Sequence, residues 1–431
     1  MENSKKLFEI ALQLESPWLV TDVKFTTIGK TSGQLDIFLD FPRGAKFQDE
    51  TGAACPVHDT KTKTWRHLDF FQHTCYLHAR VPRIKTTSGS VRLVEVPWAR
   101  RGSGFTLLFE AFAMALIEGE MPVSSAAGIL HIWAPRLWRI FAHWVGRARS
   151  RVDLSGLNKI GMDETSARRG HKYVMLSVDL DKNRVVFACP GKDENTVEQL
   201  RNYLETKGIK PKDISHFSID MSPAFIAGIR KQFPDSVVVF DRFHLKKLLN
   251  ESMDALRKLE RKEHDQLKGH KYTFLKKQKD LSDENKQAKF ELMELFPKLG
   301  DGVRFVELFD DFFAFHDKEQ AAAYLAWWCD QVEDSGIFPF NTFVNTVKLH
   351  WSGVVNWYDN KISNGVLEGI NSKVQLAKRR ARGFRNIENF INMIYFIAGD
   401  LDFGYPLKTL YPEKSIKLLH KAVDDEIYAV H

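Results

Sequence analysis

Apolar and polar positions alternate with a period of two through much of the first hundred residues. The alternating segments are VTDVKFTTIG, GQLDIFLDF, HTCYLHARVPRI and SVRLVEVPW, a pattern typical of half-buried strands. From Phe105 to Arg149 the apolar residues recur with a helical period instead. The pattern therefore predicts a β-rich module over residues 1–100, followed by a helical segment.

The helical segment divides into three helices at its prolines. Phe105–Glu118 is the first, Pro122 opens a short second helix, and Pro135 starts the third, because proline is favoured in the first turn of a helix. The third helix carries five arginines and no acid, at Arg136, Arg139, Arg147, Arg149 and Arg151. This order is typical of a helix-turn-helix unit, whose last helix enters the major groove of DNA. The alternative interpretation is a small packing subdomain.

Residues 158–245 alternate between strand and helix patterns. The predicted order is three strands (NKIGMDE, HKYVMLSVDL and RVVFACPG), a helix, the strand ISHFSID, a helix, and the strand SVVVFD. A ribonuclease-H-like core has this order, in which an antiparallel meander continues into parallel strands. Residues 244–360 are helical and too long for a connecting loop, so they form an all-α insertion or a separate domain. A last helical pair is predicted at Asn364–Arg382 and Ile387–Asp400.

Composition narrows the class of protein. The chain has 431 residues, 44% of them apolar and 27% charged, which is ordinary for a multidomain globular protein and excludes a disordered one. No run approaches the roughly 18 consecutive apolar residues of a membrane span, and the N-terminus lacks the order of a signal peptide. Four cysteines do not make a disulfide framework, so we expect a protein of the reducing cytoplasm with no membrane partner.

The positive charge of the chain is clustered. The net charge is +7, which favours a polyanionic partner. Between Lys61 and Arg101 nine Lys or Arg accompany two acids, and from Lys373 to Arg385 there are six basic residues and no acid. Each cluster alone is consistent with a solvated surface, but together they predict DNA contact. The residues that we expect to contact DNA are Arg136, Arg139, Arg147, Arg149, Lys378, Arg379, Arg380 and Arg382.

Three acids stand where such a core would present side chains to a common site. Asp163 lies at the end of the first predicted strand, Asp220 ends the fourth, and Glu368 lies near the start of a helix. The first and fourth strands of a ribonuclease-H-like sheet are neighbours, so their carboxylates can share a pair of Mg²⁺ ions that assist phosphodiester chemistry. A single aspartate at such a place is more typical of a helix cap or a surface residue, but two of them at strand ends favour a shared site.

The helix that carries Glu368 has a polar face and an apolar face. At about 100° per residue, one face holds Glu368, Asn371, Gln375, Arg379 and Arg382. The opposite face holds Leu367, Ile370, Val374 and Ala377, which we expect to pack inward. A carboxylate followed by arginines along one face suits a DNA backbone held beside a metal site.

Two further sets of residues are candidate sites. Asp241 and His244 follow the fifth strand. His244 either contacts a scissile phosphate or orients a ligand, with Asp241 as its partner. The alternative is a helix-capping Asp241 beside a His244 whose hydrogen bonds are satisfied within the fold. The pairs Cys55/His58 and Cys75/His78 have zinc-like spacing. In an alternating strand, however, Cys75 and His78 point to opposite faces, which argues against a zinc cage made of these four residues.

The chain resembles bacterial insertion-sequence transposases of the ISL-three family. The resemblance is carried by TWRHLDFFQHTCYLHARVPRI, VPWARRGSGFT, GMDETSARRGHKYV, IDMSPAFIAGI, FDRFHLKKLLN and NGVLEGINSKVQLAKRRARGFRN, which cover roughly residues 35 to 405 in family order. It implies a DDE transposase with a ribonuclease-H-like core that cuts and joins DNA at terminal inverted repeats and depends on Mg²⁺ or Mn²⁺, with two ions per site. The family's catalytic, metal-binding residues then fall on Asp163, Asp220 and Glu368. Asp241 and His244 resemble its Asp/Cys-x-x-His element.

The sequence departs from the family at the zinc-binding region. Family members carry a Cys-x-x-Cys pair where this chain has Gln48 and Thr51, and a Cys-Pro-x-His pair where it has Thr86 and roughly Gly89. None of these four is a usual zinc ligand. We therefore expect no zinc, and a β module that folds through its own core.

The expected fold class is multidomain α+β: a β-rich N-terminal module, a helix-turn-helix, and a ribonuclease-H-like α/β catalytic core interrupted by an all-α insertion. The expected domains are a degenerate zinc-finger-like module at 1–100, the helix-turn-helix domain at 101–155, the first part of the core at 156–245, the insertion at 246–355, the C-terminal core helices at 356–405 and a tail at 406–431.

The leading functional hypothesis is an active transposase that acts on nucleoid DNA as a homodimer or larger assembly, because two DNA ends must be brought together. Two alternatives remain open. One is a DNA-binding regulator without catalysis, and the other is a ribonuclease-H-like nuclease without strand transfer.

Overall fold

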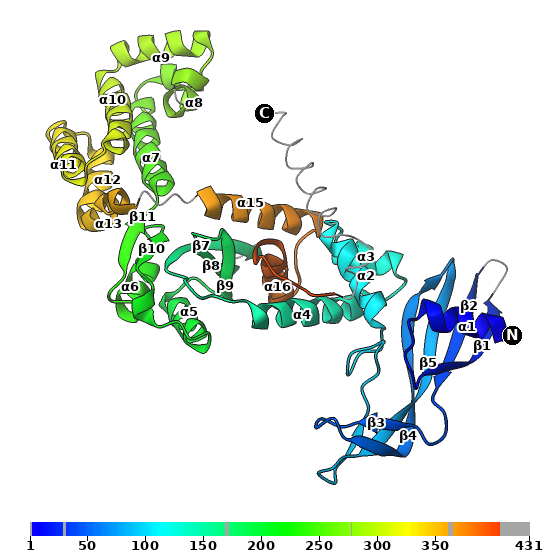
Figure 1. The fold of residues 1–431 in the computed structure, drawn as a ribbon. Helices are drawn as coiled ribbons and strands as arrows, with labels where there is room; N and C mark the ends of the chain where they lie inside the picture. Colours follow the sequence, from blue (N-terminus) through cyan, green and yellow to red (C-terminus); the bar gives the residue numbers. More distant parts are fainter. Residues whose placement is uncertain (1, 29–31, 169–171, 277, 361–364, 406–431) are drawn as a thin grey trace. The chain divides into compact units, whose positions relative to one another are not determined.

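The structure is a computed structural model that describes residues 2–28, 32–168, 172–276, 278–360 and 365–405 (Figure 1). It divides into two compact units: residues 1–144 with the short stretch that begins at Asp402, and residues 145–401. The predicted tail, 406–431, and the predicted helix start at Asn364 lie outside the described residues. Among the residues that are described, no helix is long and apolar enough to cross a bilayer.

The first unit opens with a helix and a twisted sheet, as the period-two pattern predicts. The elements are α1 (Glu2–Ala11), β1 (Leu19–Ile28), β2 (Ser32–Asp40), β3 (Lys46–Gln48), β4 (Ala54–Phe70), β5 (His73–Lys85) and β6 (Val91–Leu93). The strand order is β1-β2-β5-β4-β3, with β6 also paired to β5. Alternate side chains of the sheet, among them Ile37, Trp65 and Leu77, are buried and pack with Trp18 and Trp98 into one core. β4 is 17 residues long and was not predicted as a strand.

Three helices complete the first unit, in the predicted order. They are α2 (Leu107–Glu118), α3 (Val123–Ile129) and α4 (Ala134–Arg151), whose last residues belong to the second unit. Thr106 caps α2 by accepting a hydrogen bond from the Phe109 amide. Glu110 of α2 is completely buried and joins the helices, because Trp144 Nε1 of α4 donates to its carboxylate at 2.9 Å. This contact fixes α4 against α2.

The second unit is built on a five-stranded mixed sheet. Its elements are β7 (Lys159–Arg168), β8 (Lys172–Asp179), β9 (Arg184–Pro190), α5 (Glu194–Thr206), β10 (His216–Ile219), α6 (Pro223–Gln232) and β11 (Val237–Phe240). The strand order is β11-β10-β7-β8-β9. β7, β8 and β9 form an antiparallel meander, whereas β10 runs parallel to both β7 and β11. The predicted element order of residues 158–245 is therefore confirmed.

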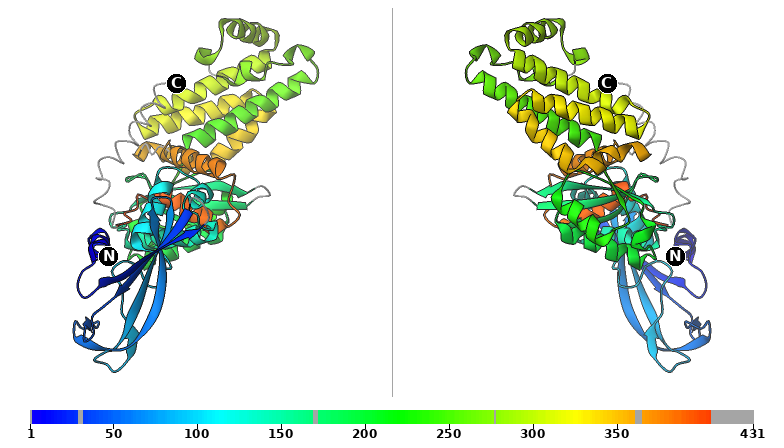
Figure 2. Two further views of the ribbon diagram at one scale, coloured as in Figure 1. Left: turned by 90° about the vertical axis from the view of Figure 1, so that its right-hand side faces the viewer. Right: turned by 90° about the vertical axis from the view of Figure 1, so that its left-hand side faces the viewer.

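After β11 the chain is helical, also as predicted. The helices are α7 (Arg242–Arg261), α8 (Lys271–Leu275), α9 (Asp283–Leu295), α10 (Pro297–Asp311), α11 (Lys318–Asp334), α12 (Phe338–Leu349), α13 (Trp351–Val355) and α14 (Trp357–Asn360). Figure 2 shows α7, α10, α11 and α12 running side by side. Trp328 is fully buried between them and donates to the Phe305 carbonyl at 3.1 Å. The helices begin and end at the sheet, because Asn356 Nδ2 donates to the Val238 carbonyl of β11 at 3.3 Å.

Two more helices return to the sheet: α15 (Gly365–Arg380) and α16 (Ile387–Ala398). Leu367, Ile370 and Val374 of α15 are buried, as the apolar face of this helix predicted. α16 covers the edge strand β9, where the Ala188 amide donates to Tyr395 Oη at 2.9 Å. The sheet of the second unit therefore lies between these helices and the α5–α6 layer.

Candidate active site and DNA-binding surfaces

Asp163 lies in the middle of β7 on the face that α15 covers. It was predicted at the end of the strand, but β7 continues to Arg168 because it pairs with β8 beyond Asp163. Met162, its neighbour, is buried in the main core, and because side chains alternate along a strand, Asp163 points the opposite way. Gly161 lies on the same face as Asp163, and a Cβ atom added there would come within 2.9 Å of Leu367 Cδ1. The glycine therefore allows α15 to lie close against β7.

Asp220 follows β10 directly, and the strand register brings it next to Asp163. β10 pairs with β7 in parallel, with His216 opposite Lys159 and Ser218 opposite Gly161. Continuing this register by two residues sets Asp220 beside Asp163. The Asp220 carboxylate is oriented by the Ser222 amide, which donates to Oδ1 at 3.1 Å.

Asp241 continues the same row on the next strand. β11 pairs in parallel with β10, with Ile219 opposite Phe240, so Asp220 and Asp241 are in line at the carboxyl edge of the sheet. Asp241 is buried and caps α7 by accepting from the Phe243 amide at 3.1 Å. His244 Nε2 lies 3.8 Å from Asp241 Oδ2, so the predicted pairing of these two residues exists alongside the helix cap. Ligands of open α/β sheets bind at this edge.

α15 is fastened along β7 by three polar contacts. Asn371 Nδ2 donates to Asp163 Oδ2 at 2.5 Å, Gln375 Nε2 donates to Thr165 Oγ1 at 2.8 Å, and Lys378 Nζ donates to the Ser166 carbonyl at 2.5 Å. The polar face predicted for this helix is therefore the face that contacts β7 through Asn371 and Gln375. We predicted that face but assigned no role to Asn371, although its position one turn after Glu368 was a signal in the sequence.

Glu368 lies on α15 one turn before Asn371, with an exposed side chain. In the part of the chain that the structure describes, no three His, Cys, Asp or Glu side chains are grouped closely enough to hold one metal ion. The structure thus brings Asp163 and Asp220 together at one edge and leaves Glu368 on the adjoining helix.

Negative charge is concentrated around Asp163 at the carboxyl edge of the sheet. The pKa of Asp163 is raised to about 6, chiefly by burial and further by the nearby Asp220 and Glu164 carboxylates. A hydrogen bond from the Glu164 amide and the positive charge of His244 act in the opposite direction. Asn371 Oδ1 is buried and accepts no hydrogen bond from the described residues. Two carboxylates and an amide oxygen without a donor are the oxygen ligands that Mg²⁺ prefers, so these residues fit a hard divalent cation.

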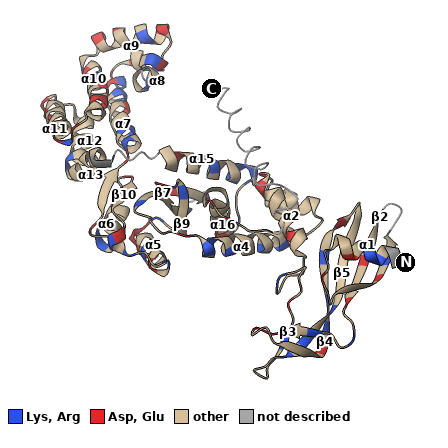
Figure 3. Ribbon diagram, viewed as in Figure 1, with Lys and Arg blue, Asp and Glu red and all other residues tan. Residues whose placement is uncertain are grey.

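The residues predicted to contact DNA have different surroundings. Arg136 lies over the Phe105 ring, with 4.4 Å from its guanidinium carbon to the ring centroid, and Arg149 lies over the Tyr395 ring at 3.6 Å. Arg139 is exposed and donates from Nε to the Pro135 carbonyl at 3.4 Å. Lys378 contacts β7 and lies with Arg379 and Arg380 in the last turn of α15, and Arg382 follows the helix. Figure 3 shows the basic end of α15.

The cysteines and histidines of the β module are spread along its strands. Cys75 is buried in the core, whereas His78 on the opposite face contacts Asp36 at 2.7 Å, as the alternation of this strand predicted. Cys55 lies opposite Phe47, near Asp49. Asp49 joins two turns, because Thr51 Oγ1 donates to its carboxylate at 2.6 Å and Thr87 Oγ1 at 2.8 Å.

Comparison with known proteins gives three family matches. The transposase domain of family ISL3 matches residues 160–394, the helix-turn-helix domain of transposase family ISL3 matches 94–145, and the zinc-finger of transposase IS204/IS1001/IS1096/IS1165 matches 53–85. The transposase for insertion sequence element IS1557 of Mycobacterium tuberculosis is 24% identical over 90% of this chain and 94% of its own length. The transposase for IS1001 of Bordetella parapertussis is 26% identical over 83% of this chain and 89% of its own length.

The zinc-finger match corrects one expectation from the sequence. We expected no zinc because Gln48, Thr51, Thr86 and Gly89 are not zinc ligands, but all four lie outside the matched residues 53–85. The match rests on the long β4–β5 ribbon, which contains both cysteine–histidine pairs. The expectation of a zinc-free module was therefore wrong, since the residues on which it rested are not those that define the match.

The other two matches agree with the geometry. The transposase domain covers β7 to α16, more than half of the chain, and includes the three-aspartate edge and α15. The helix-turn-helix domain covers α2, α3 and the first part of α4. The chain therefore belongs to transposase family ISL3 and is a DNA transposase that carries a helix-turn-helix DNA-binding domain.

Proposed function

We propose that the chain cleaves and joins DNA at the terminal inverted repeats of an insertion sequence, with Asp163, Asp220 and Glu368 as its catalytic metal ligands. The observation that carries the proposal is the parallel register of β7 and β10, which aligns the first two carboxylates. The second support is the Asn371–Asp163 hydrogen bond of 2.5 Å, which holds the helix of Glu368 against the same strand.

The core is proposed to be ribonuclease-H-like. An antiparallel meander, β7–β8–β9, continues through α5 and α6 into two strands parallel to β7, which is the order expected of such a core. On this proposal the core comprises residues 156–245 and 356–405, the insertion 246–355, the β module 1–100 and the helix-turn-helix domain 101–155. The junctions follow the changes in element type along the chain.

Two Mg²⁺ or Mn²⁺ ions are the proposed cofactors. When bound, such ions activate a water or a 3′-hydroxyl and stabilise the leaving oxygen of a phosphodiester. The chain's own contribution is orientation: Asn371 holds one oxygen of Asp163 at 2.5 Å, and the Ser222 amide holds one oxygen of Asp220 at 3.1 Å. Asp241 and His244 are proposed as accessory residues, because His244 is close enough to Asp163 to lower its pKa.

The helix-turn-helix domain is proposed to bind the terminal repeats through Arg136, Arg139, Arg147 and Arg149 of α4. The basic end of α15, with Lys378, Arg379, Arg380 and Arg382, is proposed to follow the DNA backbone near the metal site. Because two ends of one element are joined in transposition, we propose a homodimer or larger assembly on DNA. Its place of action is then the bacterial cytoplasm, on nucleoid DNA.

The test is Mg²⁺-dependent cleavage and joining of a DNA end carrying the element's terminal repeat. Asp163→Asn, Asp220→Asn and Glu368→Gln should each lower the rate by far more than about 100-fold, the upper loss typical for a mere supporting partner of a metal ligand. Repeat binding by the same preparations should persist, since each variant removes a negative charge that would face phosphate. Glu164→Gln is the matched control, because this neighbouring acid pairs with Lys192 at 3.4 Å instead.

Each outcome has a clear meaning. A variant that cuts and joins as fast as the parent removes its residue from the site, and Asp241 becomes the next acid to test. Binding without cleavage by the parent protein would favour a DNA-binding regulator, whereas cleavage without joining would favour a nuclease.

A further inference from the structure

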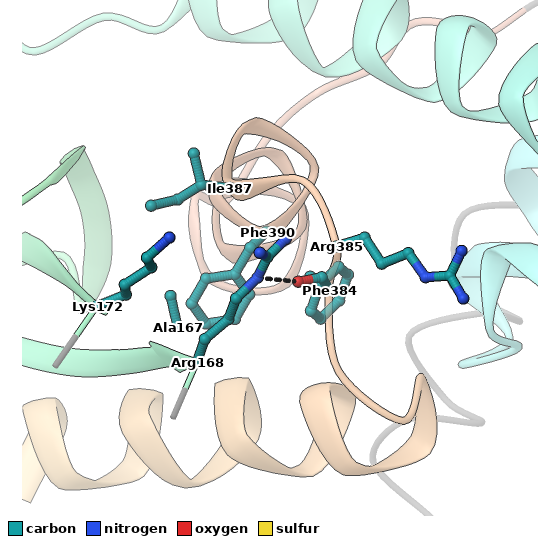
Figure 4. Close-up of a pocket in the computed structure, with 7 residues that line it drawn as sticks. All are labelled: Ala167, Arg168, Lys172, Phe384, Arg385, Ile387 and Phe390. Atoms are coloured by element: carbon teal, nitrogen blue, oxygen red, sulfur yellow. Dashed lines mark hydrogen bonds between the residues drawn. The ribbon is translucent and has the colours of Figure 1, made fainter. Parts of the chain in front are cut away.

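A cavity of about 170 Å³ lies where the end of β7, the start of β8 and the loop between α15 and α16 meet (Figure 4). Its base is apolar: Phe384 and Phe390 are buried and their ring centroids are 5.1 Å apart. Its rim carries three exposed cations, Arg168, Lys172 and Arg385. Among the described residues, no acid lines it. The site therefore combines a packed base with a positively charged rim.

One cation of the rim, Arg168, is held in place, and the loop beside it is anchored to α15. Arg168 Nε donates to the Phe384 carbonyl at 2.9 Å, which orients the guanidinium and ties the end of β7 to the loop. α15 ends just before this loop in a turn where the Gly383 amide, at a φ of +89°, donates to the Lys378 carbonyl at 2.8 Å. Lys378 in turn contacts the Ser166 carbonyl. Donors held this way lose little conformational entropy on binding an anion.

The arrangement of the three cations favours an extended polyanion over a small ion. In Figure 4, Lys172, Arg168 and Arg385 follow one another across the cavity, and the guanidinium of Arg385 points away from the other two. One phosphate ion would therefore miss at least one of the three cations, whereas successive phosphates of a DNA strand can reach all of them. Arginine and lysine side chains on rigid elements commonly bind DNA in this way, through the backbone and without reading sequence.

The distance along β7 from Arg168 at the cavity to Asp163 can be expressed as a number of nucleotides. Arg168 is five residues after Asp163 on β7, which at about 3.3 Å per residue is about 16 Å. Phosphates of one strand recur about every 3.4 Å along a DNA duplex, so about five nucleotides separate these points.

We propose that Arg168, Lys172 and Arg385 bind backbone phosphates of the DNA about five nucleotides from the bond that is cut. The five-nucleotide position rests on the proposed function, because that proposal assumes that the bond to be cut lies beside Asp163. The binding itself rests only on the cavity. It adds a second, sequence-independent contact beyond the basic face of α15, and it holds the strand in line with β7.

The test measures the affinity of the full-length protein for DNA across 50–200 mM salt, the range in which phosphate contacts dominate. EDTA is present so that no cleavage occurs, and the probes are a duplex carrying the terminal repeat and a duplex of arbitrary sequence. Lys172→Gln and Arg385→Gln should each flatten the slope of log affinity against log salt by about 0.9, and the double variant by about 1.8, on both probes. The matched control is Lys212→Gln, an exposed lysine just before β10, at the opposite end of the sheet.

Unchanged slopes in the double variant would overturn the proposal. A double variant that loses affinity only for the repeat would also overturn it, because that result indicates base reading. A third arm adds inorganic phosphate at matched ionic strength: competition that depends on Arg385 would identify a small-anion site instead. Failure of the proposed function leaves these measurements unaffected, since they need neither metal nor cleavage.

The register is tested separately by ethylating single phosphates of the repeat probe. Ethylation about five nucleotides from the cut should weaken binding of the parent and leave binding of the double variant unchanged. Interference at the same phosphates in both proteins would contradict the assigned register.

Discussion

Two carboxylates, one in each unit, show how the same chemical group has different roles. Glu110 in α2 is fully buried and accepts hydrogen bonds from Arg100 Nε at 2.8 Å, Ser103 Oγ at 2.6 Å and Trp144 Nε1 at 2.9 Å. Asp163 in β7 is half-buried, faces Asp220, and has a raised pKa. Glu110 has its countercharge within the chain. Asp163 has no comparable set of hydrogen-bond donors among the described residues and faces a second carboxylate, so it is suited to binding a cation from solution.

The largest expected effect is a loss of stability when Glu110 is removed. Glu110→Ala should destabilise the first unit by about 3–5 kcal/mol, because it removes the fully buried partner of the half-buried Arg100 and the acceptor of the buried Trp144 Nε1. Hydrogen exchange of the α2 and α4 amides in increasing urea measures this loss directly in the helices that Glu110 joins.

Asp163→Asn provides the contrast, since it should leave the second unit as stable as the parent, or more so.

A loss below about 1 kcal/mol in Glu110→Ala would mean that the helices are held by their apolar packing alone.

The second prediction is a pH dependence that belongs to Asp163. Its pKa is raised to about 6, so the native state binds this proton more tightly than the unfolded chain does. Stability of metal-free protein should therefore fall as the pH rises from about 4 to about 6, by about 3 kcal/mol in total, and should level off above that. Urea unfolding in EDTA at several pH values measures the change. Asp163→Asn should lack the fall, and a parent that gains stability over this interval would contradict the raised pKa.

The smallest of the three effects concerns the helix contact at Asp163. Asn371→Ala removes the 2.5 Å hydrogen bond that orients this carboxylate while leaving every proposed metal ligand in place. We expect cleavage to slow by about 10–100-fold, the usual loss when a partner of a metal ligand is removed, and the slowing should be partly relieved by higher Mg²⁺. Gln375→Ala is the matched control, because Gln375 contacts Thr165 on the same strand and helix face. Equal rates in both variants would mean that Asn371 only packs α15.

The sequence predicted the features that depend on local pattern. The order of elements in residues 158–245 followed from apolar periodicity, and the closeness of Asp163 and Asp220 followed from the expectation that the first and fourth strands are neighbours. β4 was missed because the burial of its middle, KTKTWRH, does not alternate: Lys61 and Thr62 are both exposed, and Trp65 and Arg66 are both buried. Its polar residues therefore resemble a loop.

Contacts between distant segments could not be predicted in the same way. Arg149 was expected to contact DNA because it lies in an arginine-rich helix, and that prediction stays open. The contact that was not predicted is with Tyr395, whose ring centroid lies 3.6 Å from its guanidinium carbon. Nothing near Arg149 in the sequence indicates this partner, which depends on α16 packing over β9. Likewise, Glu110 is one acid inside an apolar segment, and only the fold supplies Arg100 and Trp144 as its partners.

The return of the long helical segment to its starting strand affects how the protein assembles. Asn356 contacts the Val238 carbonyl of the strand from which α7 departs, and the short approach of Gly353 to Phe240 leaves no room for a side chain there. Once these helices have folded, the two ends of the helical segment are already close together. Packing α15 against β7 then no longer carries the entropic cost of closing a loop of more than a hundred residues. During synthesis, however, β7 emerges some two hundred residues before its partner Asn371. An incomplete chain therefore has Asp163 and Asp220 but not the helix beside them, and the contact between Asn371 and Asp163 forms only when the protein is nearly finished.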